Sequence, residues 1–256
     1  MPDYPPNPGQ SVLLYLEGGG GCFDPESCID RCTVGSPQLC TQDPALVKNF
    51  TGSIWSGEEE ENPGLHTSYK VYVPYCTSDI YAGRRDPDEV SAGYAFHGKF
   101  VIEAIVEDLL NNVLFEVDIS QFVLMGMSAG RINQKYFTLK ILPGAFGVGN
   151  NCDSVATRVR ESQAGTDVRC IMDGLDFYPT DLSVEGCDPL AIGAAAAEFW
   201  QAEVDQSCRE ENGVGSPECL LFATYYPYIE TPFMLVVPYE DTSMEVLKTH
   251  CSINPR

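Results

Sequence analysis

The residues of this chain best placed to do chemistry lie in Gly126-Met127-Ser128-Ala129-Gly130. They follow an apolar run, residues 122–125, that is typical of a buried strand, and they precede a segment, residues 131–139, that we expect to be helical. Gly-x-Ser-x-Gly between a strand and a helix is a nucleophile elbow, whose sharp turn exposes the serine hydroxyl. The amide after the serine, that of Ala129, can bind a developing oxyanion. The pattern therefore predicts a serine hydrolase with Ser128 as nucleophile.

A second segment suited to acyl transfer follows the apolar run at residues 11–16. The chain there continues as Glu17-Gly18-Gly19-Gly20-Gly21. Hydrolases of this architecture place the second oxyanion donor after a buried strand, where small residues let backbone amides point inward. We assign Gly19 and Gly20, together with Ala129, to an oxyanion hole. The alternative is a plain flexible turn.

The acid and the base of a triad must come later in the chain, in the order Ser, acid, His. An expected strand at 233–237 leads to Asp241, the candidate acid, with Glu240 as second choice. Of the three histidines only His250 follows, nine residues after Asp241. Acid and base normally stand after successive strands, and a crossover takes a dozen or more residues. The base is therefore either His250 folded back, or a histidine beyond Arg256 in a longer protein.

Alternating apolar runs place these residues on an α/β fold. We expect strands at 11–16, 70–74, 122–125 and 233–237 and another just before Asp173, with helices at 99–111 and 190–206. Cysteine-bearing loops are expected at 22–40 and 150–190. Strands that alternate with helices need crossover connections, which produce a mostly parallel sheet. Residues 1–256 are expected to form a single domain, a fragment without its C-terminal elements.

Cysteine content and charge narrow the class of protein. Eleven cysteines, none in Cys-x-x-Cys, indicate disulfides and secretion rather than a zinc site, and Asn49-Phe50-Thr51 is a glycosylation sequon. The N-terminus does not have the pattern of a signal peptide. The formal charge of −22 argues against nucleic acid and polyanionic partners. The longest apolar stretch, 190–199, is shorter than the roughly 18 residues that a membrane span requires.

Several polar residues have structural interpretations that we favour over catalytic ones. Cys76 is expected to be half of a disulfide, and His97 a cap or packing group before a helix. Asp173 and Asp176 precede the position at which the acid is expected, so they are interpreted as structural or rim residues.

A family resemblance rests on motifs spread over the whole chain. They are Leu13-Leu14-Tyr15-Leu16-Glu17-Gly18-Gly19-Gly20-Gly21-Cys22, Val73-Pro74-Tyr75-Cys76-Thr77-Ser78-Asp79, Phe96-His97-Gly98, Gly126-Met127-Ser128-Ala129-Gly130 and Pro227-Tyr228-Ile229-Glu230-Thr231-Pro232. In these the chain resembles the pectin acetylesterase and Notum family of secreted carboxylesterases. The resemblance implies an α/β-hydrolase-like three-layer sandwich, a Ser-Asp-His triad with Ser128 and Asp241 in the matching positions, structural disulfides, and neither metal nor cofactor.

The chain departs from that family in three places. Nothing matches the triad histidine, since Thr249-His250-Cys251-Ser252 is only a superficial likeness. The family usually has an aromatic residue within the stretch that here is four glycines, so the shape of the acyl pocket does not follow from the resemblance. Arg131 replaces the usual glycine and is expected to pair with an acid such as Glu17, because a cation is unfavourable at a helix N-terminus.

These observations favour a carboxylic ester hydrolase acting on an O-acylated glycan or another O-acyl ester. A non-catalytic glycan- or lipid-binding member of the same fold, with an incomplete triad, is the alternative. A serine peptidase of this fold is a weaker third reading.

Overall fold

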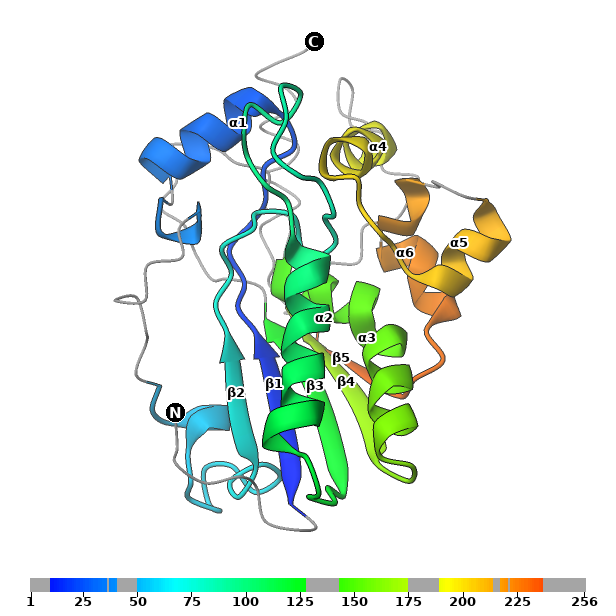
Figure 1. Cartoon of the computed structure of the whole chain (residues 1–256). Helices are drawn as coiled ribbons and strands as arrows, with labels where there is room; N and C mark the ends of the chain where they lie inside the picture. The colour runs from blue at the N-terminus through cyan, green and yellow to red at the C-terminus, as the bar shows by residue number, and fades with distance from the viewer. Residues whose placement is uncertain are drawn as a thin grey trace.

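The computed structural model describes residues 10–35, 37–40, 50–127, 143–174, 189–213, 217–220 and 222–236. At its centre lies a five-stranded sheet in the order β2-β1-β3-β4-β5, with every described pairing parallel (Figure 1). The strands are β1 Ser11–Leu16, β2 Tyr69–Val73, β3 Gln121–Met127, β4 Asp167–Asp173 and β5 Phe233–Val236. The predicted parallel sheet is confirmed, and each strand lies within a few residues of its expected place.

Helices and single helical turns occupy the connections between the strands. The α-helices are α1 Pro25–Asp30, α2 Gly98–Asp108, α3 Pro143–Ser162, α4 Pro189–Trp200, α5 Gln206–Asn212 and α6 Phe222–Tyr225. The shorter turns are η1 Arg31–Gly35, η2 Pro37–Cys40, η4 Ser53–Trp55, η5 Leu109–Val113, η6 Pro217–Leu220 and η7 Tyr226–Tyr228. In Figure 1, α2 and α3 lie in front of the sheet, whereas α1 and α4 lie beyond the carboxyl ends of the strands.

The sheet is buried on both faces, which explains the continuous apolar runs of its strands. Successive side chains of a strand point to opposite faces. Val12 and Leu14 of β1 therefore belong to the large core that also holds α2 and α3, whereas Leu13 and Tyr15 pack toward Trp55 of η4. A helical layer and a layer of loops and short turns thus enclose the sheet, as expected of an α/β-hydrolase-like fold.

Three expectations about the connections are wrong. The loop expected at 22–40 contains the helix α1 and the short turns η1 and η2. The single helix expected at 190–206 is divided, because Gln201 takes a positive φ of 49° after α4, and Asp205 then caps α5 by accepting a bond from the Cys208 amide at 2.9 Å. The loop expected at 150–190 begins instead with the end of α3. Its later part contains β4, the strand expected before Asp173.

Disulfides tie the connections together within short stretches of chain. The structure contains Cys22–Cys28, Cys32–Cys40, Cys152–Cys170 and Cys208–Cys219. The third bond fastens α3 to β4, and the first closes on α1, whose N-cap Asp24 and Ser27 form a reciprocal capping box. The expected disulfide framework is therefore confirmed.

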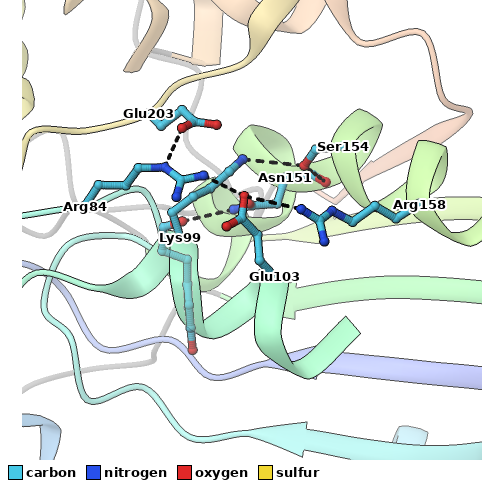
Figure 2. Close-up of polar contacts among 8 residues, drawn as sticks. Arg84, Lys99, Glu103, Asn151, Ser154, Arg158 and Glu203 are labelled. Atoms are coloured by element: carbon cyan, nitrogen blue, oxygen red, sulfur yellow. Dashed lines mark hydrogen bonds and ion pairs between the residues drawn. The ribbon is translucent and has the colours of Figure 1, made fainter. Parts of the chain in front are cut away.

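An ion-pair network joins α2 and α3 to the segment after α4 (Figure 2). Arg84 contacts Glu203 and donates to Glu103 at 2.6 Å, and Arg158 of α3 lies 3.9 Å from the same Glu103 oxygen. The Lys99 ammonium, on a side chain that is almost wholly buried, donates to Ser154 Oγ at 3.5 Å. Burial lowers the pKa of Lys99, and the nearby Glu203 and Glu103 carboxylates oppose that shift.

Candidate active site

The order of the strands creates a topological switch point between β1 and β3. The chain leaves β1 toward β2 and leaves β3 toward β4, in opposite directions along the sheet. Parallel α/β sheets bind ligands at such a switch point, outside the carboxyl ends of the strands. Leu16 at the end of β1 pairs with Gly126 of β3. The glycines begin two residues after Leu16. They therefore start close to Gly126 and Met127, the two residues that precede Ser128.

Ser128 and Ala129 themselves lie outside the described residues, as do Arg131, Asp176, Glu240, Asp241, His250 and the sequon Asn49. Of the assigned oxyanion donors, the structure describes Gly19 and Gly20. It brings both to the switch point, at the carboxyl end of β1. The role of each of these residues stays a prediction.

The glycine segment, Gly18 to Gly21, has a backbone that suits amide donors. Gly20 has φ +76° and Gly19 has φ +156°, values that side chains with a Cβ rarely adopt. Gly19 is buried, whereas Gly20 is partly exposed. Among the described residues, no acceptor is found for the amide of either one. Backbone amides in such a position are suited to bind a ligand oxygen.

Both ends of the glycine segment are fastened to the chain that follows β2. At one end, the Glu17 amide donates to Val73 O at 3.1 Å and the Glu17 carboxylate accepts from the Tyr75 amide at 2.9 Å. Tyr81 Oη donates to the Glu17 carbonyl at 2.9 Å. At the other end, the Cys22 amide donates to Ser78 O at 3.1 Å. Sequence reasoning assigned no role in the site to Tyr75, Ser78 or Tyr81, because their bonds join segments about sixty residues apart.

Strand β4 brings a carboxylate, that of Asp173, to the same edge of the sheet. Asp173 at the end of β4 pairs with Met127 on one side and with Val236 of β5 on the other. Burial raises the pKa of Asp173. Burial, with Asp173 and Glu17 nearby, raises the pKa of Tyr15 to about 12. Asp173 thus stands on the rim, between the elbow strand and the strand that leads to Asp241, in keeping with its rim interpretation.

The two described histidines, His66 and His97, both precede Ser128 in the chain, so neither has the position in the order that is expected of the base. His97 occupies the N-cap position of α2 without a capping side-chain bond, and its Nε2 lies 2.9 Å from Asp86 Oδ1. Its ring meets Phe100 edge to face at 5.5 Å. The packing role expected for His97 is confirmed, and the capping role is not. The carbonyl of His66, before β2, accepts from Lys70 Nζ at 3.1 Å.

Comparison with known proteins identifies the family. The family model described as Pectinacetylesterase matches residues 7–255. The chain belongs to the pectinacetylesterase family. It is 26% identical over 253 residues to human palmitoleoyl-protein carboxylesterase NOTUM, covering 95% of this chain and 47% of that protein. It is 27% identical over 252 residues to palmitoleoyl-protein carboxylesterase notum1a of Danio rerio, covering 95% of this chain and 47% of the relative.

Solved structures agree with the fold of this pectinacetylesterase-family chain. The structure of the Wnt deacylase Notum from Drosophila matches with a TM-score of 0.79 and 24% identity, covering 96% of this chain and 67% of that one. The chain spans about half the length of the curated relatives it matches. The resemblance seen in the sequence is therefore confirmed at the level of family and of fold.

One cysteine of this family member contradicts its sequence interpretation. Cys76, expected to be half of a disulfide, is a free cysteine and is partly buried. Burial and the carboxylates of Asp79 and Glu17 raise the pKa of its thiol. A raised pKa disfavours the thiolate, which is the reactive form of a cysteine. Cys76 lines a cavity of about 470 Å³ together with Ser78, Tyr94 and Phe100.

Neither a metal centre nor a membrane helix is found in the described part of this family member. No group of three or more His, Cys, Asp or Glu side chains in those ranges is arranged to hold a metal ion. Similarly, none of the described helices combines the length and apolar character needed to cross a bilayer.

Proposed function

We propose that this protein is a carboxylic ester hydrolase that forms an acyl-enzyme on Ser128. The observation that carries the proposal is the position of the glycine segment. It leaves β1 at the switch point, beside the strand that ends in Met127, and its Gly19 and Gly20 amides have no acceptor among the described residues. An ester hydrolase needs such donors next to its nucleophile.

In the proposed mechanism the Ser128 hydroxyl attacks the acyl carbon and gives its proton to a histidine base. Asp241, after β5, orients that histidine. The amides of Gly19, Gly20 and Ala129 stabilise the negative oxygen of the tetrahedral intermediate. The intermediate collapses when the protonated histidine donates to the leaving alcohol. Water then attacks the acyl-enzyme by the same route and releases the acid.

The substrate class follows from the family and from the charge. The family is named for an esterase acting on acetylated pectin, and the relatives are named as carboxylesterases for palmitoleoyl-protein. Removal of an O-acyl group is common to both names. We propose an O-acylated glycan or another O-acyl ester, with neutral substrates preferred over polyanionic ones because the chain carries a formal charge of −22. The four disulfides found among the described residues support an extracellular location.

The test is hydrolysis of p-nitrophenyl acetate by the purified chain and by Ser128→Ala, with Ser162→Ala, an exposed serine at the end of α3, as the control. We expect Ser128→Ala to lower kcat by at least about 1,000-fold and to abolish labelling by a fluorophosphonate. Ser162→Ala should retain both. His250→Ala in the same assay decides whether His250 is the base.

Turnover that survives Ser128→Ala would refute the proposal. A parent chain that binds an acylated glycan but neither hydrolyses esters nor takes up the fluorophosphonate would instead be the non-catalytic binding protein of the alternative reading.

A further inference from the structure

The segment after β2 holds the glycine segment in place, and the buried carboxylate of Asp79 holds the segment after β2. Ser78 supplies the carbonyl that binds the Cys22 amide, and Tyr81 supplies the hydroxyl that binds the Glu17 carbonyl. Tyr75 bonds the Glu17 carboxylate through its amide and accepts from the Ile80 amide at 2.8 Å through its hydroxyl. The positions of these groups therefore depend on the conformation of the turn at residues 78–81.

That turn is conformationally unfavourable by itself. Ser78, Ile80 and Tyr81 have φ values of 57°, 51° and 59°. Residues with a Cβ avoid this region, and a β-branched residue such as Ile80 avoids it most strongly. Such a conformation persists only where the surroundings impose it, and it is found preferentially at functional sites.

The side chain of Asp79 is bonded to this turn. Its carboxylate is completely buried and accepts three hydrogen bonds. Oδ1 accepts from the Thr77 hydroxyl and from the Tyr81 amide at 3.1 Å, and Oδ2 accepts from the Gly98 amide at 2.7 Å. Burial raises the pKa of Asp79, while the bonds from Thr77, Gly98 and Tyr81 favour its ionised form. Gly98 opens the 11-residue helix α2, so the carboxylate also joins the turn to a helix N-terminus.

The packing around the carboxylate leaves no freedom to reposition it. A Cβ on Gly98 would lie 2.2 Å from Asp79 Oδ1, and one on Gly83 would lie 2.4 Å from Oδ2. Buried Arg31 also donates through Nε to Ser78 Oγ at 2.8 Å. The turn is therefore held both by the fully hydrogen-bonded Asp79 carboxyl group and by the buried Arg31 guanidinium.

We infer that Asp79 is a positioning residue for the oxyanion hole, acting through the 78–81 turn on the amides of Gly19 and Gly20. The inference rests on the proposed function for its catalytic consequence. Asp79 does not touch the substrate. It holds Ser78, Ile80 and Tyr81 in left-handed conformations. Ser78 then holds one end of the glycine segment, and Tyr81 and Tyr75 hold the other, with Ile80 bonded to the Tyr75 hydroxyl.

The test replaces Asp79 by asparagine in the full chain. Either orientation of the new amide sets an NH2 group against a backbone N–H, that of Tyr81 or that of Gly98. We expect kcat for p-nitrophenyl acetate to fall about 10- to 100-fold while KM changes less than about twofold. The inhibition constant of phenylboronic acid, which forms a tetrahedral adduct with the serine, should rise by the same factor as kcat/KM falls. Amide exchange of residues 17–23 should become faster.

Two further variants keep the test decisive. Asp86→Asn is the matched control, an exposed aspartate in the same connection, and should leave all these quantities unchanged. Thr77→Val removes one donor to Asp79 while conserving shape, and should give a smaller change in the same direction. It carries the test if Asp79→Asn fails to fold. Folded variants of Asp79 and Thr77 with unchanged kcat, boronate affinity and exchange would overturn the inference.

Failure of the proposed function is distinguishable from failure of this inference. If the parent chain shows no Ser128-dependent hydrolysis, the proposed function fails, and amide exchange alone then decides. Faster exchange at 17–23 in Asp79→Asn, with none in Asp86→Asn, supports the positioning role, and equal exchange in both overturns it.

Discussion

Gly19 is the residue at which the fold and the proposed chemistry constrain each other most closely. It combines φ +156° with a position where an added Cβ would lie 2.5 Å from Leu39 Cδ1 and 3.2 Å from Tyr75 Cδ1. The same residue is an assigned oxyanion donor. A side chain here would both strain the backbone and displace the amide.

We therefore predict that Gly19→Ala lowers the free energy of unfolding by about 1–3 kcal/mol and lowers kcat for p-nitrophenyl acetate. Urea unfolding and steady-state kinetics measure the two effects. Gly57→Ala is the control, because a Cβ there meets nothing within 4 Å. A Gly19→Ala protein as stable and as active as the Gly57→Ala protein would remove Gly19 from the oxyanion hole.

At the scale of elements, the connection between α4 and α5 is held to the core through Glu203. Its amide donates to Ala82 O at 2.8 Å and its carboxylate pairs with Arg84, whose own amide donates to Trp200 O at 3.1 Å. Partial burial raises the pKa of Glu203, but the hydrogen bond from Arg84, with the positive charges of Lys99, Arg84 and Arg209, outweighs it, and the net shift is downward.

The lowered pKa gives a pH dependence whose sign can be stated. Glu203 binds fewer protons in the folded protein, so its stabilisation is present above its ordinary pKa of 4.5 and is lost as pH falls through the lower folded value. Because the pair is partly exposed, we predict that Glu203→Gln costs only about 0.5 kcal/mol at neutral pH. Urea unfolding at several pH values should show this difference disappearing in acid.

The control for that measurement is Glu107→Gln, an exposed glutamate of α2 that belongs to no ion pair of the network in Figure 2. A loss for Glu203→Gln that persists unchanged in acid would show that the carboxylate acts through packing and not through its charge.

At the scale of the whole molecule, the dominant property is the formal charge of −22, from 37 acidic and 15 basic residues. Such a charge repels anionic substrates in encounter, and salt screens the repulsion over a Debye length of about 10 Å at 0.1 M ionic strength. The glycine segment itself contains no basic residue that would offset this field.

We predict that kcat/KM for an anionic ester, p-nitrophenyl succinate, rises several-fold relative to p-nitrophenyl acetate when NaCl increases from about 20 mM to about 500 mM. Both esters present the same leaving group, so the ratio isolates the charge of the acyl chain. A ratio that is independent of salt would show that the site is shielded from the overall charge, and would reopen polyanionic polymers as substrates.

The elements of the fold that could be predicted are those whose sequence pattern depends only on neighbouring residues. Strands β1 and β3 were predictable because both faces of the sheet are buried, which makes their apolar runs continuous. Helix α3 was missed because it contains Gly147 and Gly149, which disfavour a helix in isolation. A Cβ at Gly147 would lie 2.5 Å from Tyr81 Cδ2, and one at Gly149 would lie 2.1 Å from Tyr225 Oη. Tyrosine rings from distant segments therefore leave no space for a side chain at these two positions.

The candidate site divides in the same way. A glycine run after one strand and Gly-x-Ser-x-Gly after another are local patterns, and the sequence by itself determined that both leave the carboxyl ends of parallel strands. That β1 and β3 are neighbours was decided by the tertiary structure alone, as were the free thiol of Cys76 and the three bonds of Asp79. The physical reason is that local periodicity reports which side chains are buried, whereas the partner of a strand, a thiol or a carboxylate is chosen by packing between segments far apart in the chain.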